Sequence, residues 1–147
     1  MIRFREIVSG LMGRRPSPLQ VGALCLRHRN GAPEVLLISS LDTGRWIIPK
    51  GWPMRGRSLA GAALQEAWEE AGIRGRVRHE AVGSFSYDKV RSGGLAQRCE
   101  VRVFVIETEA MAERFPEMGR RRREWLAPAE AAARVSEPEL QAILRAL

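Results

Sequence analysis

Three glutamates in the middle of the chain have the types and spacing for metal-assisted chemistry. Glu66, Glu69 and Glu70 stand at i, i+3 and i+4, so a helix places their carboxylates on one face. Like charges at this spacing repel by about 0.2–0.5 kcal/mol per pair. Acids in the last turn of a helix cost a further ~0.3–1 kcal/mol against its dipole. The alternatives are a solvated acidic face, or a site where Mg²⁺ or Mn²⁺ relieves both penalties.

A basic loop containing glycines directly precedes these acids, and its amides and cations can hold phosphates. An acidic metal face beside such a loop suits phosphoanhydride hydrolysis, because the metal neutralises phosphate oxygens and activates a water that a carboxylate orients or deprotonates. The predicted substrate-binding residues are Arg45, Lys50, Gly51 and Arg57. The three glutamates are predicted to be catalytic and to bind the metal, with Glu66 the first choice for positioning the water.

The spacing within this region resembles that of the Nudix box. Gly51 is followed at the required distance by the stretch QEAWEEAGI, residues 65–73. The preceding RWIIPKG (45–51) and the downstream RRREW (121–125) resemble the branch that contains diphosphoinositol polyphosphate and diadenosine polyphosphate hydrolases. This resemblance implies an α/β/α sandwich with a mixed sheet and the box as loop–helix–loop. It also implies a Mg²⁺- or Mn²⁺-dependent hydrolase that cleaves phosphoanhydride bonds of nucleoside-diphosphate-linked or polyphosphorylated compounds, of the dinucleoside polyphosphate or inositol pyrophosphate type.

Two box positions depart from the family pattern. Arg57 stands where the first glutamate of the box is expected, and Gln65 stands where an arginine precedes the catalytic glutamate. The family arginine typically helps to orient the catalytic carboxylates. Two interpretations stay open: an active hydrolase that tolerates both changes, or a catalytically weakened protein that binds a ligand on the same fold.

Local patterns predict the elements that position these residues. Ser58 is a suitable cap for a helix that ends near Ala71, with Gly72 as its stop. A turn at Asn30-Gly31 predicts a hairpin. The predicted strands are 21–26, 34–39, 46–48, 77–90 with a break near Gly83, 100–108 and 123–126, and closing helices are predicted at 128–134 and 138–147. Strands, a helix, strands and then helices indicate an α/β sandwich with a mixed sheet.

Composition limits the classes of partner. The formal charge of +7 favours polyanions, including nucleotides, inositol phosphates and RNA. A module for single-stranded RNA needs exposed aromatics for stacking, yet only 6% of residues are aromatic. Nucleic acid therefore ranks below a small-molecule polyphosphate as the partner, except for a capped RNA end. The oligomeric state stays open.

Length and hydropathy predict one domain at residues 18–147, preceded by a flexible lead-in at residues 1–17. No apolar run is long enough for a membrane helix, and the first residues do not resemble a signal peptide. We therefore expect a cytoplasmic protein that does not bind membranes. Cys25 and Cys99 lie in apolar runs and are expected to be buried, reduced thiols.

Several further residues carry weaker signals. Trp52 lies in the phosphate loop and could either stack on a base or pack against the helix. The run 120–123 is interpreted as a solvated segment, with contact to a phosphate chain as the alternative. Glu100 and Glu107 are candidates for an additional metal ligand. Three other tryptophans are expected in the core and two histidines at the surface: Trp46, Trp68, Trp125, His28 and His79.

Overall fold

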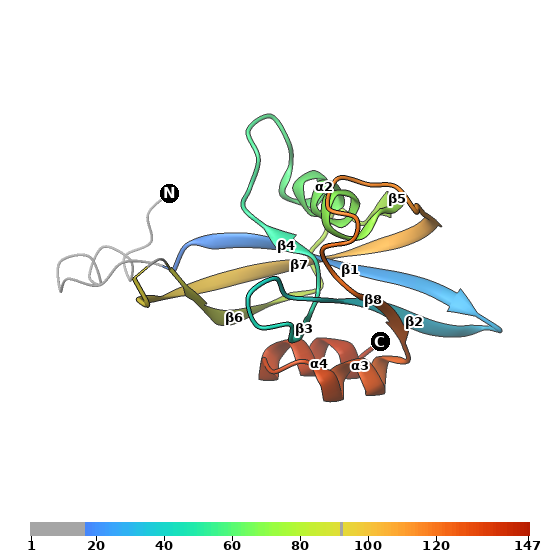
Figure 1. Ribbon diagram of the computed structural model, residues 1–147. Coiled ribbons are helices and arrows are strands. Elements are labelled where there is room, and N and C mark those ends of the chain that lie inside the picture. The colour runs from blue at the N-terminus through green and yellow to red at the C-terminus, as the bar shows by residue number, and fades with distance from the viewer. Residues whose placement is uncertain (1–16, 92) are drawn as a thin grey trace.

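The computed structural model describes residues 17–91 and 93–147 (Figure 1). The predicted lead-in therefore lies, except for Ser17, outside the described residues. Within the described part, the helices and strands begin and end close to the predicted positions, and the differences concern the sheet.

Among residues 17–91 and 93–147, eight strands form one mixed sheet. Its central pair, β1 (Leu19–Arg29) and β7 (Ala96–Met111), runs parallel, and every other pairing is antiparallel. Along its main path the order is β3-β2-β1-β7-β5, while β4 pairs with β1, β6 with β7 and β8 with β2. The remaining strands are β2 (Ala32–Ser39), β3 (Trp46–Ile47), β4 (Lys50–Gly51), β5 (Ile73–Val77), β6 (Gly83–Val90) and β8 (Arg123–Leu126).

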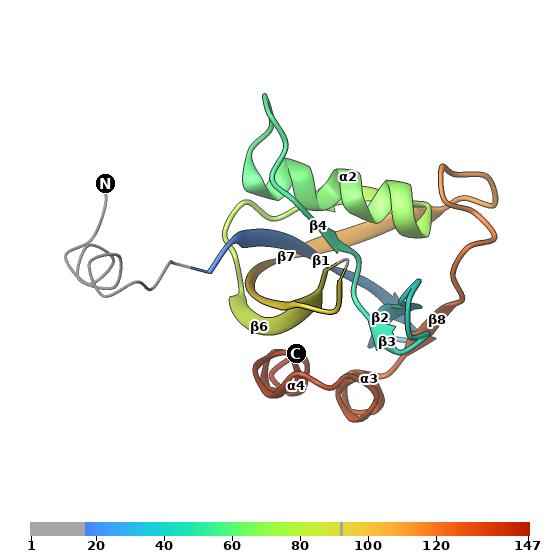
Figure 2. The same ribbon diagram turned by 60° about the vertical axis from the view of Figure 1, so that its left-hand side comes forward.

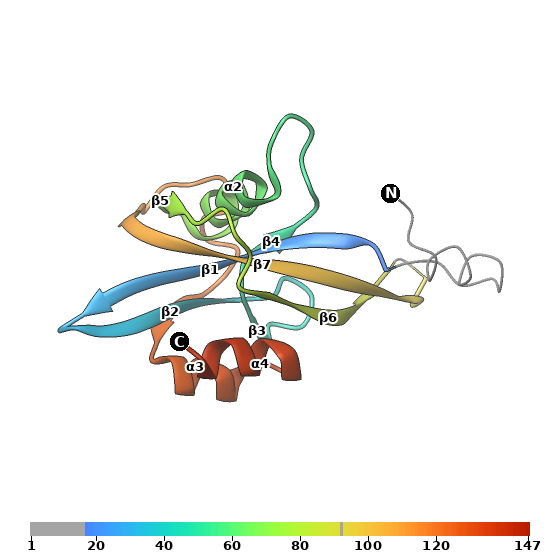
Figure 3. The ribbon, with the colours of Figure 1, turned by 180° about the vertical axis from the view of Figure 1, so that it is seen from behind.

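Helices cover both faces of the sheet. Helix α2 (Leu59–Ala71) lies on one face, and α3 (Pro128–Arg134) with α4 (Pro138–Arg145) lies on the other (Figures 1 and 2). The view from behind shows the same three layers, with the long strands β1 and β7 between the helices (Figure 3). The predicted α/β/α sandwich with a mixed sheet is confirmed.

Alternation along β1 divides the core into two parts. Val21, Ala23 and Cys25 pack in the cluster that includes the alanines of α2, while Leu24 and Leu26 pack in the cluster of α3 and α4. Successive side chains of a strand point to opposite faces, so one strand supports both layers. Cys25 and Cys99 belong to different clusters, and both are free and buried as predicted.

The ends of α2 follow the predicted capping. The Ser58 hydroxyl accepts a hydrogen bond from the Gly61 amide at 3.0 Å. Gly72 ends the helix in the left-handed region at φ 71°, where a side chain would be strained. Ala63 and Ala67 are fully buried and let the helix lie close to the sheet. These features fix which residues of α2 face away from the sheet.

The hairpin between β1 and β2 is confirmed, since Asn30 and Gly31 both have positive φ, at 53° and 79°. The prediction for residues 77–90 is partly wrong. Strand β5 begins earlier, at Ile73, where it pairs with the far end of β7, and residues 78–82 belong to no strand. Residues 50–51 were predicted as loop but form β4, because their backbone pairs with β1 at Val21 and Gly22.

None of the helices in the described part of the chain is both long enough and apolar enough to cross a membrane.

Candidate active site

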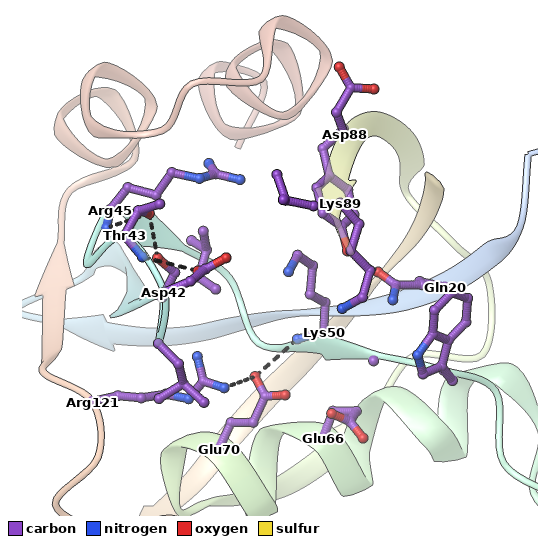
Figure 4. A pocket seen from close by; sticks show the side chains of 17 residues that line it. Gln20, Asp42, Thr43, Arg45, Lys50, Glu66, Glu70, Asp88, Lys89 and Arg121 are labelled. Atoms are coloured by element: carbon purple, nitrogen blue, oxygen red, sulfur yellow. Dashed lines mark hydrogen bonds and ion pairs between the residues drawn. The ribbon is translucent and has the colours of Figure 1, made fainter. Parts of the chain in front are cut away.

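A cavity of about 550 Å³ lies beside the acidic face of α2 (Figure 4). Its walls come from segments far apart in the sequence: β1, the β2–β3 loop, β4, α2, β6 and the segment before β8. The polar and charged residues that line it are Gln20, Ser40, Asp42, Thr43, Arg45, Lys50, Glu66, Glu70, Tyr87, Asp88, Lys89 and Arg121. The sheet topology is therefore what assembles this site.

Two of the three predicted glutamates reach the cavity. Glu66 and Glu70 lie one helical turn apart and both point into it from α2 (Figure 4). Burial, and then a hydrogen bond to Glu66, raise the pKa of Glu70 to about 9. Burial also raises the pKa of Glu66. Without a cation the pair therefore tends to hold a proton at neutral pH.

Strand β4 sets the distance between the loop and these carboxylates. The Lys50 amide donates to Glu70 Oε1 at 3.3 Å. A Cβ atom added to Gly51 would lie 2.4 Å from the Glu66 carboxylate, so a side chain at this position would displace Glu66. Glycine is thus required at position 51 because the Glu66 carboxylate lies close to its backbone, and not because the backbone is left-handed.

Arg121 supplies a buried cation beside the acids. Its guanidinium lies 3.9 Å from Glu70 Oε1 and 3.3 Å from Glu117 Oε1, and its side chain is only 10% exposed. It also donates to the Ser39 carbonyl at 3.2 Å, which ties it to the end of β2. Arg121 therefore offsets part of the charge of Glu70 within the protein itself.

The segment that carries Arg121 also caps the end of α2. The Glu117 amide donates to the Glu69 carbonyl, the Ala112 amide to the Gly72 carbonyl, and Arg123 to the Ala71 carbonyl. The last carbonyls of a helix have no partner within it, so these bonds satisfy groups that would otherwise need water. The solvated interpretation of residues 120–123 is wrong for Arg121 and Arg123, which are half-buried and make these contacts.

Lys50 is held over an aromatic ring at the wall of the cavity. Its ammonium lies 4.5 Å from the centre of the Tyr87 ring, and burial lowers its pKa. The Tyr87 hydroxyl forms a 2.6 Å hydrogen bond with Gln20 Oε1. Burial raises the pKa of Tyr87, so the phenol stays neutral at physiological pH.

Arg45 stands between this cavity and a neighbouring one. Its guanidinium donates to the buried Glu137 carboxylate at 2.8 Å, at the start of α4. Glu137 thus already compensates the charge that Arg45 would bring to a phosphate.

The structure does not bring every predicted residue together. Arg45, Lys50, Gly51, Glu66 and Glu70 line the cavity. Glu69 and Arg57 are not among the residues that line it.

Gln65 and Arg57, the two departures from the box, have different surroundings. Gln65 donates to Glu69 Oε2 at 2.9 Å and so orients the one predicted carboxylate outside the cavity. Arg57 is exposed in the loop before α2.

The charged and amide lining residues that sequence reasoning missed are Gln20, Asp42, Lys89 and, as an individual residue, Arg121. No local signal distinguishes them, because their positions depend on strand pairing and loop closure. Tyr87 and Asp88 of β6 also line the cavity.

The acidic and aromatic residues that carried weaker sequence signals lie away from the cavity, apart from Trp52. Glu107 forms an ion pair with Arg78, Glu100 lies near Arg102, and neither lines the cavity. Trp46 and Trp125 pack against the two core clusters, while Trp68 is half-buried under the guanidinium of Arg74 and belongs to neither cluster. His28 and His79 are exposed, as predicted.

The donor set fits a divalent cation that keeps several non-protein ligands. Within the ranges 17–91 and 93–147, no group of three His, Cys, Asp or Glu side chains is arranged to hold a metal. Glu66 and Glu70 nevertheless offer carboxylate oxygens to one cavity, and both are disfavoured as anions there. Mg²⁺ commonly binds through one or two carboxylates plus waters and substrate phosphates, which matches this pair.

Comparisons with known proteins agree with this geometry. The family model described as the NUDIX domain matches residues 16–147. The chain is 33% identical over 106 residues to Nudix hydrolase 21, chloroplastic, of Arabidopsis thaliana, covering 71% of this chain and 52% of that protein. It is 32% identical over 72 residues to diphosphoinositol polyphosphate phosphohydrolase 3-beta of Bos taurus, covering 49% of this chain and 43% of that protein. The chain thus spans about half the length of these curated relatives.

A solved structure of a C. elegans Ap4A hydrolase has the same fold, with a TM-score of 0.65 over 87% of this chain and 93% of that chain, at 20% identity. The match of the family model to nearly the whole described chain, together with the box on α2, identifies the protein's family. The chain belongs to the Nudix family.

Proposed function

We propose that the protein is a metal-dependent hydrolase that cleaves a phosphoanhydride bond in a compound with a diphosphate linked to another group. The observation that carries this proposal is the cavity in which Glu66 and Glu70 face Lys50 and Arg121. Acids that hold a divalent cation and bases that hold phosphates are both needed for this reaction, and here they share one space. The relatives named above are hydrolases of the same family.

In this proposal Glu66 and Glu70 would hold Mg²⁺ or Mn²⁺, which would supply charge neutralisation for the phosphate oxygens and a more acidic water. Glu66 is the preferred group for positioning that water, because its carboxylate is the less buried of the two. Glu69 lies outside the lining, where its Oε2 accepts a hydrogen bond from Gln65, so the proposal assigns it no first contact with the metal.

The basic residues are proposed to contact the phosphates to different extents. Lys50 and Arg121 are both anchored within the cavity. The Lys50 ammonium lies over the Tyr87 ring, and the Arg121 guanidinium lies 3.9 Å from Glu70 Oε1. Arg45 contacts a phosphate only if its bond to Glu137 is exchanged for one to the substrate. Arg57 has no part in the first contacts, since it lies outside the lining.

A phosphate-release screen over dinucleoside polyphosphates, nucleotide sugars, capped RNA ends and inositol pyrophosphates tests the proposal, with Mg²⁺ and with Mn²⁺. Wild-type protein is expected to turn over at least one substrate, and Glu66→Gln and Glu70→Gln to reduce the rate by a factor of about 100 or more.

A second function is favoured by Glu69, a predicted metal ligand that bonds to Gln65 and does not line the cavity. It is ligand binding without efficient catalysis. Tight metal-dependent binding of a nucleotide, with turnover no greater than that of Glu66→Gln, would establish it and contradict hydrolysis.

A further inference from the structure

Large exposed hydrophobic side chains border the charged cavity. Leu41, Trp52 and Val90 all line it, and they are 48%, 41% and 63% exposed. They come from three separate segments: the β2–β3 loop, the residue after β4 and the last residue of β6. Single exposed hydrophobics need no explanation. Three at one cavity with a charged floor form the kind of surface that binds an apolar group attached to an anion.

Trp52 has the best-defined position of the three. It directly follows Gly51, whose backbone lies against the Glu66 carboxylate, and pairing of β4 with β1 fixes that backbone. Pro53 follows and restricts the chain on the other side. The indole is therefore attached next to the end of the cavity where the carboxylates lie.

The other aromatic residue in the described lining is not available to a ligand. Tyr87 is only 7% exposed, its hydroxyl is bonded to Gln20, and the Lys50 ammonium covers its ring. Among the described lining residues, Trp52 is thus the aromatic ring that a ligand can reach.

The charge of the cavity differs from that of the whole protein. Among the described lining residues, the acids Asp42, Glu66, Glu70 and Asp88 formally balance the bases Arg45, Lys50, Lys89 and Arg121. The formal charge of +7 therefore lies elsewhere on the molecule. The neighbouring cavity adds no surplus of bases, since Arg45 and Arg98 face Asp88, Glu137 and Glu139. With a cation held by Glu66 and Glu70, the remaining lining acids are Asp42 in the β2–β3 loop and Asp88 in β6. A ligand with phosphates on all sides would still meet these two carboxylates away from the metal.

We propose that Trp52, with Leu41 and Val90 beside it, binds the planar base of a nucleoside-linked diphosphate, and that the same cavity disfavours inositol pyrophosphates. This inference rests on the proposed function, because it places the diphosphate between Lys50, Arg121 and the metal. Stacking of a base on an aromatic side chain strengthens binding about tenfold or more. An inositol ring, a cyclohexane that carries a phosphate on every carbon, offers Trp52 no such planar surface.

Isothermal titration calorimetry with Mg²⁺ tests the inference without requiring turnover. Wild-type protein is titrated with ADP and, separately, with inorganic diphosphate. ADP is expected to bind about tenfold or more tightly than diphosphate. Trp52→Ala should abolish that advantage and leave diphosphate affinity unchanged, whereas Trp52→Phe should retain most of it. Val82→Ala, an exposed apolar residue away from the cavity, is the matched control and should change neither affinity.

Several outcomes overturn the inference. Equal loss of ADP and diphosphate affinity in Trp52→Ala would mean that Trp52 only supports the structure. Tighter binding of inositol hexakisphosphate than of ADP would contradict the selectivity, and binding of neither ADP nor diphosphate would contradict the site. Base-dependent binding by a wild-type protein that turns over no substrate would overturn the proposed hydrolysis alone.

Discussion

Glu70 shows how a single buried acid couples metal binding to stability. Its carboxyl is 7% exposed, and its pKa of about 9 lies well above the ordinary value of 4.5. Arg121 at 3.9 Å lowers that pKa but does not cancel the effect of burial. Above about pH 4.5 this carboxyl ionises freely in the unfolded chain, whereas the folded protein must either keep the proton or bury the charge. The folded state is therefore destabilised relative to the unfolded state as the pH rises.

The pH dependence of stability follows from that sign. The stability that the protonated Glu70 provides is complete below about pH 4.5 and is lost as pH rises from there towards about 9. In metal-free buffer at pH 7.5, Glu70→Gln should therefore be more stable than wild type, by on the order of 1 kcal/mol or more. The difference should vanish near pH 4.5. Thermal unfolding across this pH range measures it, with the exposed Glu113→Gln as the control. No pH dependence of the difference would contradict the assignment.

Substitution of Gly51 should impair turnover much more than it impairs folding. In Gly51→Ala the new Cβ would collide with the Glu66 carboxylate, which is the far end of a flexible side chain and can move aside. Unfolding temperature should change by only a few degrees, since the collision is relieved cheaply. Turnover should fall by about tenfold or more because Glu66 no longer points at the metal. Gly56→Ala, which meets no neighbouring atom but has a positive φ, should show the opposite pattern of lost stability and retained activity.

At the scale of elements, α2 was predictable because its signals are local. The Ser58 cap, the small buried face and Gly72 all lie within the helix or next to it. The short strand β4 was not predictable, because residues 50–51 become a strand only by pairing with β1. The early start of β5 was missed for the same reason, since its partner is the distant end of β7.

The difference between local signals and long-range contacts also explains which residues of the site were predictable. Glu66 and Glu70 follow from helical spacing, whereas Gln20, Lys89 and Arg121 reach the cavity only through the tertiary arrangement. Glu69 shared the predicted helical face, yet it lies outside the lining and accepts a hydrogen bond from Gln65, four residues earlier. Arg57 was placed in the site by its proximity in sequence, but the loop before α2 carries it outside the lining.

Arg123 is the side chain that connects the long segment after β7 to α2. It donates to the Ala71 carbonyl at 2.9 Å and to the Ala112 carbonyl at 3.0 Å. Arg123→Met should keep much of the packing but lose both bonds, and should destabilise the protein by about 1–3 kcal/mol. Chemical denaturation measures this, with the exposed Arg120→Met as the control. An unchanged midpoint would mean that the segment does not stabilise the end of α2.

At the scale of the whole molecule, the basic charge and the balanced cavity predict two different responses to salt. Contacts between surface arginines and a polyanion release counterions, so binding of single-stranded RNA should weaken at least about tenfold between about 50 and about 200 mM salt. The KM of a nucleotide substrate should change by less than about threefold, because its charge is met within the cavity. Fluorescence anisotropy and steady-state kinetics measure the two. RNA binding as insensitive to salt as the KM would indicate a specific nucleic-acid site instead.

The central claim is that Glu66 and Glu70 hold a catalytic cation in the cavity that Lys50 and Arg121 also face. A crystal soaked with Mn²⁺ and a non-hydrolysable dinucleoside polyphosphate tests it most directly, because the anomalous signal of manganese locates the metal independently of the protein model. We predict Mn²⁺ at about 2.1 Å from carboxylate oxygens of both glutamates and from phosphate oxygens of the ligand. Manganese bound elsewhere, or a ligand bound in this cavity with no metal at Glu66 and Glu70, would contradict the account.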